Sequence, residues 1–150
     1  MRLVVPAFQK GTIPRRQTAD GLDLSPAVEL LDLPERARFL ALILADPDAP
    51  GGEFLHWGVL CWPHTRRRLE EGFPRARIGP DGIRQLVNDY GWVGYGGPNP
   101  PEGSVHRYVL SAVALAERLD PSVVSTLPEL RLALDRAALA SAQLVATYGR

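Results

Sequence analysis

The distribution of proline and glycine limits the possible folds of this chain more than any other feature of its sequence. The chain has 14 prolines and 14 glycines among 150 residues. Every proline lies at or before Pro128, and Gly149 is the one glycine in the final 22 residues. Because proline removes a backbone donor and glycine favours turns, long helices are excluded from the first part of the chain. The chain therefore divides into a long segment rich in turns and a short C-terminal segment predicted to be helical.

Short apolar runs in the first part are predicted to be β-strands. They are Arg2–Phe8, Val28–Leu33, Arg38–Ala45, Leu55–Trp62 and Val105–Ala114. Turns rich in proline and glycine separate these runs, which favours an all-β core, and the lack of strand–helix alternation argues against a Rossmann-type sheet. The run Leu55–Trp62 is apolar at nearly every position apart from His56. Such a run is typical of a strand buried on both faces, as in the middle of a β-sandwich.

The C-terminal segment carries the signature of an amphipathic helix. The stretch from Thr126 to Glu129 has capping-box spacing, with proline admitted in the first turn. Apolar and small residues follow at steps of three and four, namely Leu130, Leu134, Ala137, Ser141, Leu144 and Tyr148. This stripe predicts a helix after Leu127 that packs on the side of the sandwich.

Length and composition predict one domain over residues 1–150. The 17 basic residues balance the 17 acidic ones, so the net charge is zero. A protein that coats nucleic acid or an anionic membrane normally carries excess positive charge, so no nucleic-acid partner is expected. No apolar run approaches the roughly 20 residues of a transmembrane helix, and the first residues do not resemble a signal peptide. One cysteine cannot form an internal disulfide, and we expect a cytoplasmic protein.

Titratable residues lie at one end of three predicted strands. His56 is near the start of one, His106 is near the start of another, and Asp46 and Asp48 bracket a proline directly after a third. If these strand ends meet, they form a small polar pocket in apolar surroundings. Each residue also has a plainer interpretation. The stretch Asp46–Pro50 is a good turn sequence, and a single histidine at a strand end is more often structural than a ligand.

Other candidate residues carry weaker signals. Cys61 is predicted to be a small hydrophobe in a strand, facing away from His56. Three histidines and one cysteine without paired spacing do not indicate a metal site. The segment Asn88–His106 holds five of the 14 glycines. Its Gly-Gly-Pro stretch is expected to let the backbone approach a ligand and present N–H groups to an anion, although a long loop needs glycine anyway.

Four motifs in this order resemble the phosphatidylethanolamine-binding proteins, and in particular their short bacterial and archaeal, Raf-kinase-inhibitor-like branch. The motifs are Asp46–Pro50, His56-Trp57, Gly96–Pro101 and His106–Tyr108, and the patterns at both chain ends also fit. The resemblance implies a β-sandwich with a flanking C-terminal helix and a small pocket for phosphate or a phosphoryl headgroup. By position, the resemblance implies a pocket built from Asp46, Asp48, His56, Gly97, His106 and Tyr108. Departures from the family pattern, such as Asn99 in place of a common cysteine, concern the rim of that pocket.

Three functions are compatible with these residues. The first is a module that binds a small anion or a phospholipid headgroup, with Asp46 orienting one histidine and Asp48 pairing with Arg107. The second is a regulator of a kinase or protease through surface contacts. The third is an enzyme in which the His/Asp cluster acts as acid and base. We favour binding without catalysis, cofactor or metal, because no nucleophile with an aligned base and oxyanion site is evident.

Overall fold

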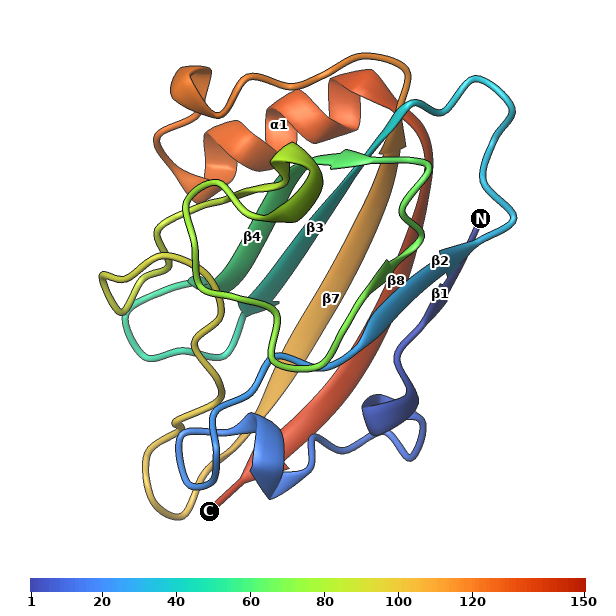
Figure 1. Ribbon diagram of the computed structural model, residues 1–150. Coiled ribbons are helices and arrows are strands. Elements are labelled where there is room, and N and C mark those ends of the chain that lie inside the picture. Colours follow the sequence, from blue (N-terminus) through green and yellow to red (C-terminus); the bar gives the residue numbers. More distant parts are fainter.

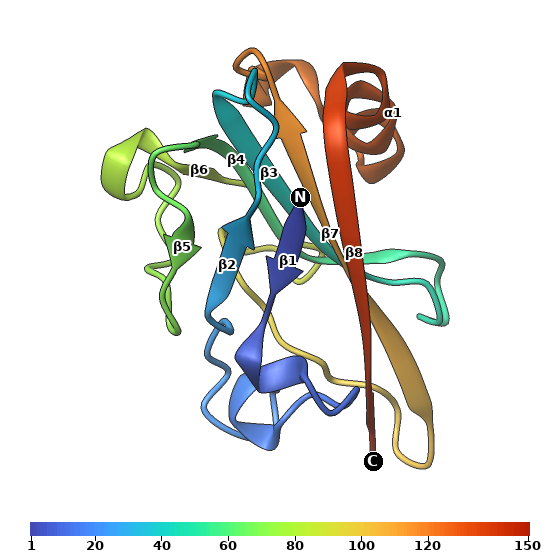
Figure 2. The same ribbon diagram turned by 90° about the vertical axis from the view of Figure 1, so that its right-hand side faces the viewer.

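Two antiparallel sheets face each other in the computed structural model, which describes residues 1–150 (Figure 1). The smaller sheet has the order β1-β2-β5, with bounds Arg2–Val4, Val28–Leu31 and Arg68–Leu69. The larger sheet has the order β6-β4-β3-β7-β8, with bounds Arg84–Gln85, Phe54–Pro63, Phe39–Asp46, Val105–Leu115 and Ala138–Gly149. Helix α1, Leu127–Ala137, covers the outer face of the larger sheet (Figure 2). Short 3-10 turns occur at Pro6–Phe8, Arg15–Gln17, Pro80–Gly82 and Pro121–Val123.

Two apolar clusters hold these layers together. The first has 21 buried residues and fills the space between the two sheets, with Trp57 and Trp62 of β4 among its largest members. The second has 10 buried residues and joins the larger sheet to Leu130 and Leu134 of α1. Strand β4 contributes to both clusters, which confirms that the run Leu55–Trp62 is buried on both faces. The mainly β fold with a helix near the C-terminus is confirmed as well.

The predicted strands differ in how closely their bounds match the strands of the structure. The runs Arg38–Ala45, Leu55–Trp62 and Val105–Ala114 correspond to β3, β4 and β7 within one residue at each end. Arg2–Phe8 is extended only to Val4, because Pro6 begins a 3-10 turn. The strand predicted over Val28–Leu33 ends at Leu31, and the next residue has a positive φ of 54°. Strands β5 and β6 have two residues each and were not predicted.

The prediction that the helical stripe extends to Ser141, Leu144 and Tyr148 is wrong. Helix α1 ends at Ala137, and the following 12 residues form β8, which pairs along the full length of β7. Neither glycine nor proline marks this change. Leu144 and Tyr148 are an even number of residues apart, so they share a face of a strand as well as of a helix. The extensive pairing with β7 therefore decides between two structures that the local pattern fits equally well.

Candidate functional site

The larger sheet brings three polar strand ends together. Strand β3 lies between β4 and β7, and its last residue is Asp46. Asp46 pairs in register with Phe54 of β4, two residues before His56. On the other side, Ala45 pairs with Val109 of β7, three residues after His106. The strand order therefore places the carboxylate of β3 between the two histidines, as expected if the predicted strand ends meet.

His106 and Asp46 form a buried pair. The His106 Nδ1 atom lies 2.6 Å from Asp46 Oδ2, and the two side chains are 8% and 5% exposed. Because a carboxylate accepts hydrogen bonds, the proton of this contact belongs to Nδ1, which fixes the neutral tautomer of the imidazole. The Nε2 atom of His106 then carries a lone pair when the ring is neutral and a proton when it is charged. The expected role of Asp46, orienting a histidine, matches this geometry.

His56 is held in the same tautomer by a different partner. Its Nδ1 atom lies 2.6 Å from the carbonyl oxygen of Gly96, which can only accept. Burial lowers the pKa of His56, because removal from water disfavours the charged imidazolium. The Nε2 atoms of His56 and His106 have no hydrogen-bond partner in the protein, and neither atom is sealed off from solvent. Both side chains therefore present a free ring nitrogen.

The two histidines line a cavity of about 200 Å³ with otherwise mostly apolar walls. Tyr108 lies between the rings, with centroid separations of 5.2 Å to His56 and 6.4 Å to His106. Burial raises the pKa of Tyr108 well above its ordinary value, so its hydroxyl stays protonated and can donate. The remaining lining residues are Ala49, Pro50, Phe54, Tyr90, Asn99, Pro100 and Pro101, together with Asp46.

Asp48 does not line this cavity. Its carboxylate accepts hydrogen bonds from the backbone N–H and the guanidinium of Arg107, at 2.8 to 3.0 Å. These bonds hold the pKa of Asp48 at about 2. Strand β3 ends at Asp46, so the backbone of β3 does not continue to Arg107 of β7. The Asp48 side chain instead accepts the hydrogen bond of the Arg107 N–H. The pairing of Asp48 with Arg107 was expected, but it makes Asp48 a part of the turn and not of the cavity wall.

Gly97 also lies outside the cavity lining, and the expected donation of glycine N–H groups to an anion is wrong for this loop. The N–H of Gly97 donates to Asp23 Oδ1 at 2.7 Å, and the N–H of Gly96 donates to the His56 carbonyl at 2.9 Å. A Cβ at Gly97 would come within 2.3 Å of the Gln17 carbonyl oxygen. Glycine is therefore needed here because the loop packs directly on the backbone of the N-terminal segment.

Sequence reasoning missed the aromatic wall of the cavity. Tyr90 contacts Phe54 and His56 at centroid separations of 4.7 and 5.6 Å, and its hydroxyl donates to the Gly97 carbonyl. The sequence feature that could have indicated Tyr90 is its position in the glycine-rich segment that precedes His106. Pro100 and Pro101 were part of a recognised motif, but nothing in the sequence showed that their rings would form a wall.

The other reactive residues lie elsewhere. Cys61 is buried in the cluster beneath α1, and burial raises the pKa of its thiol. It faces away from the histidine cavity, as predicted, although register shifts interrupt the regular alternation of β4. His64 bonds the Arg38 carbonyl through Nδ1 outside the cavity. No group of three or more His, Cys, Asp or Glu side chains is positioned to hold a metal ion. The structure contains no helix with the length and apolar character needed to cross a membrane.

Comparison with known families gives one consistent result. A family model described as phosphatidylethanolamine-binding protein matches residues 5–149. A protein of Methanothermobacter thermautotrophicus named UPF0098 protein is 40% identical over 151 residues, covering 100% of this chain and 99% of its own length. The similarly named protein of Aquifex aeolicus is 39% identical over 155 residues, covering 100% of this chain and 89% of its own.

Solved structures show the same fold. The crystal structure of Escherichia coli YbcL, described as a member of the mammalian PEBP family, superposes with a TM-score of 0.88 at 27% identity, covering 99% of this chain and 98% of that one. A phosphatidylethanolamine-binding protein homologue from Chlamydia trachomatis superposes with a TM-score of 0.84 at 34% identity, covering 99% and 96%. The resemblance noted in the sequence is confirmed.

Proposed function

The chain belongs to the phosphatidylethanolamine-binding protein family, and from that premise we propose that its histidine cavity binds a small anion, namely a phosphoryl group or the phosphoryl headgroup of a phospholipid. The observation that carries the proposal is the matched orientation of the two histidines. His56 and His106 each use Nδ1 to bind a protein acceptor and leave Nε2 free at one small cavity. Two ring nitrogens preset in this way form a recognition site for oxygen atoms once they carry protons.

Protonation is the step that turns this cavity into an anion site. A phosphoryl oxygen accepts hydrogen bonds, and a neutral Nε2 has no proton to give. At least one imidazole must therefore be charged, or the ligand must bring a proton of its own. When His106 is charged it faces the Asp46 carboxylate at 2.6 Å, so the new positive charge has a partner. The Tyr108 hydroxyl adds a neutral donor between the two rings.

The walls of the cavity favour a headgroup over a whole lipid. A volume of about 200 Å³ is below the roughly 300–1,000 Å³ of pockets that enclose a drug-sized ligand. We infer that only the phosphoryl group and its nearest atoms enter, with any acyl chains left outside. Phe54, Pro50 and Pro101 surround the polar centre with apolar surface, which strengthens each hydrogen bond made there.

A second candidate function, acid–base catalysis, is favoured by one observation. The buried Asp46–His106 pair has the orientation in which a carboxylate fixes a histidine as a general base or acid. Release of product from a phosphate ester, lost in His106→Gln, would establish this activity, whereas binding without turnover would dismiss it. Regulation of a kinase or protease and a cytoplasmic location both stay predictions.

Calorimetric titration tests the binding proposal. We expect acetate affinity to rise as the pH falls from about 8 to 5, because histidine protonates in this range while the ligand stays charged. Phosphate affinity should rise and then flatten, since phosphate esters themselves take up a proton near pH 6. Both His56→Gln and His106→Gln should weaken binding, and His64→Gln, which alters the histidine outside the cavity, should not. Affinity that is independent of pH, or unchanged in both cavity variants, would show that the assignment is wrong.

A further inference from the structure

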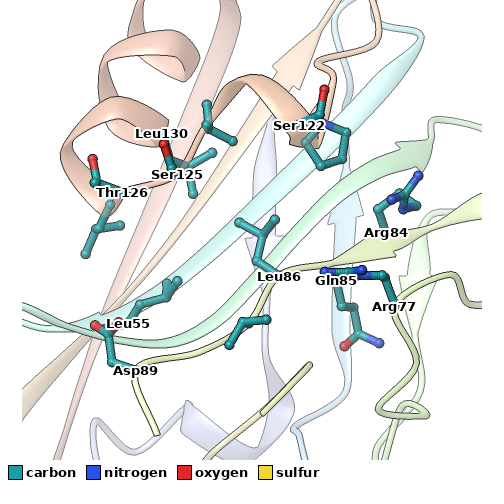
Figure 3. A pocket seen from close by; sticks show the side chains of 14 residues that line it. Leu55, Arg77, Arg84, Gln85, Leu86, Asp89, Ser122, Ser125, Thr126 and Leu130 are labelled. Atoms are coloured by element: carbon teal, nitrogen blue, oxygen red, sulfur yellow. The ribbon is translucent and has the colours of Figure 1, made fainter. Parts of the chain in front are cut away.

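A second and larger cavity, of about 430 Å³, lies between the N-terminal end of α1 and the β6 edge of the larger sheet (Figure 3). It shares no lining residue with the histidine cavity. Its volume falls within the range of roughly 300–1,000 Å³ that is usual for small-molecule sites. Its walls come from β4, from the segment around β6 and from the residues that lead into α1.

One side of this cavity carries two arginines that form no ion pair, although the charge of Arg84 contributes to lowering the pKa of the nearby Asp120. Arg77 and Arg84 both line it, and neither forms an ion pair or a side-chain hydrogen bond in the protein. Backbone pairing between Gln85 and Arg77 brings their two segments together. The Nε atom of Arg84 is the one buried side-chain nitrogen or oxygen of the chain that lacks a hydrogen-bond partner. Buried polar groups are almost always satisfied, so this unpaired donor distinguishes Arg84 from the other arginines of the chain.

A serine hydroxyl lies beside these arginines. Figure 3 shows Ser122 on the same side of the cavity as Arg84 and Arg77. Both the backbone N–H and the hydroxyl of Ser122 interact with the Asp120 carboxylate, which lowers the pKa of Asp120. Guanidinium and hydroxyl groups together are typical of sites for carboxylate or phosphate oxygens, which arginine binds through two N–H groups at once.

The opposite side of the cavity carries leucines beside Ser125 and Thr126 (Figure 3). Leu55 and Leu130 lie across from the arginines, with Leu86 between the two sides (Figure 3). Asp89 also lies on this far side, where its Oδ2 accepts the Leu55 N–H at 2.6 Å. The negative charge of Asp89 is therefore placed away from the arginines. The cavity therefore has a cationic side and, across from it, a leucine surface bordered by polar groups.

We propose that this cavity is a second ligand site, separate from the histidine cavity, that takes a small amphiphilic anion: a carboxylate or phosphate monoester with a short apolar chain. The anionic group binds the terminal guanidinium N–H groups of Arg84 and Arg77. The chain lies on Leu55, Leu86 and Leu130. Charge and apolar contact are both required, so an amine or an uncharged alcohol of the same chain length does not bind.

Because both cavities are assigned anions, the test has to resolve the two sites. Backbone amide signals of the labelled protein are followed by NMR during titration with hexanoate and with hexyl phosphate, and with hexylamine and hexanol as controls. We expect the two anions to shift the signals of residues 84–86 and 122–127 in a saturable manner, and the relative affinities to show which anionic group is preferred. Shifts confined to the neighbours of His56 and His106, or equal responses to hexylamine, would overturn the proposal.

Variants identify the residues responsible. Arg84→Gln is expected to weaken anion binding at this cavity at least tenfold, and Arg77→Gln, at an exposed position where the fold is not at risk, should weaken it severalfold. Arg36→Gln removes an exposed arginine outside the cavity and should leave the affinity unchanged. The double variant His56→Gln/His106→Gln should retain binding here even if it abolishes the other site. Unchanged affinity in both Arg84→Gln and Arg77→Gln would refute the assignment.

Discussion

At the scale of single residues, the two cavity histidines differ in the groups that stabilise or destabilise a positive charge on the imidazole ring. His106 is hydrogen-bonded to a carboxylate, whereas His56 is hydrogen-bonded to the Gly96 carbonyl and packs against aromatic rings. Burial therefore lowers the pKa of His56 from its ordinary value of 6.5. As the pH falls, the unfolded chain takes up this proton before the folded protein does. The contribution of neutral His56 to stability is complete above about pH 6.5 and is lost as the pH falls from there toward the lower folded pKa.

This linkage predicts how His56→Gln changes the pH dependence of unfolding. Without ligand, the free energy of unfolding of the wild type should fall between pH 7.5 and 5.5 by up to about 1.4 kcal/mol more than that of the variant, because one proton is taken up on unfolding. Glutamine keeps a donor for the Gly96 carbonyl but does not titrate. Urea denaturation at the two pH values measures the difference, and His64→Gln should behave like the wild type. Equal pH slopes for wild type and His56→Gln would contradict the prediction.

The close packing around Gly97 predicts that Gly97→Ala loses stability, and Gly51→Ala serves as its control. In Gly97→Ala the new Cβ meets the Gln17 carbonyl oxygen at 2.3 Å, and backbone cannot move aside as a flexible side chain can. We expect a loss of about 1–3 kcal/mol in the free energy of unfolding, as for other overpacked sites. Gly51→Ala places its Cβ in open space and should be close to neutral. If urea denaturation gives both variants the same stability, the packing of the loop on the N-terminal segment is not as described.

At the scale of elements, the sequence predicts those strands whose apolar pattern fits a strand and no other structure. Strands β3 and β4 are apolar on both faces and end at proline or glycine turns, so their bounds follow from composition. Strand β8 has no such turn before it, and its spacing fits a helix. Only the partner strand β7, which lies more than 20 residues earlier in the chain, decides its structure. The strands β5 and β6 are too short for any periodic signal.

Proline substitutions distinguish a strand from a helix at β8. The Thr147 N–H donates to Gly11, away from β7, so the N–H of Gln143 also faces away and that of Ala142 faces the ladder. Ala142→Pro removes a ladder bond and leaves an acceptor unpaired, whereas Gln143→Pro does not. We expect Ala142→Pro to lower the free energy of unfolding by about 1–3 kcal/mol more than Gln143→Pro. In a helix the two prolines would be equally damaging, and equal losses in thermal or urea unfolding would exclude the strand.

Cys61 gives a second test at this scale, because it lies in an irregular part of β4. The register between β3 and β4 shifts here, and Cys61 has a positive φ of 56°. Its side chain is buried beneath α1, and burial raises the pKa of the thiol. The folded protein should therefore react with a thiol reagent many times more slowly than the urea-unfolded protein. Rapid stoichiometric labelling of the folded protein would show that α1 does not cover this strand.

At the scale of the whole molecule, contacts between residues near both ends of the chain extend to one wall of the histidine cavity. Asp20 accepts hydrogen bonds from the Tyr148 hydroxyl and from the guanidinium of Arg150. Arg150 also donates to the carbonyl of Pro100, which lines the cavity. Asp46, His56 and His106 could be selected from the sequence because each follows or begins an apolar strand. The roles of Asp20 and Arg150 could not, because they arise only when segments 130 residues apart meet.

The contacts of Asp20 with Tyr148 and Arg150 predict that Asp20→Asn loses both stability and ligand binding. The hydrogen bonds from Arg150 and Tyr148 hold the pKa of Asp20 at about 2, below its usual 3.8. Its contribution to stability is present above about pH 4 and is lost as the pH falls toward 2, because the unfolded chain is protonated first. The variant should melt at a lower temperature than the wild type at pH 7, and the two melting curves should converge between pH 4 and 2.

The same variant should bind acetate more weakly at pH 6, because the loop that carries Pro100 loses the arginine that fixes it. Asp32→Asn is the matched control, since the Asp32 carboxylate lies 3.8 Å from Arg2 on an exposed surface where an ion pair contributes little. That variant should keep the wild-type melting temperature at pH 7 and the wild-type acetate affinity. If Asp20→Asn melts early but binds acetate normally, the chain ends stabilise the fold without shaping the cavity, and the wall formed by Pro100 is held by the loop alone.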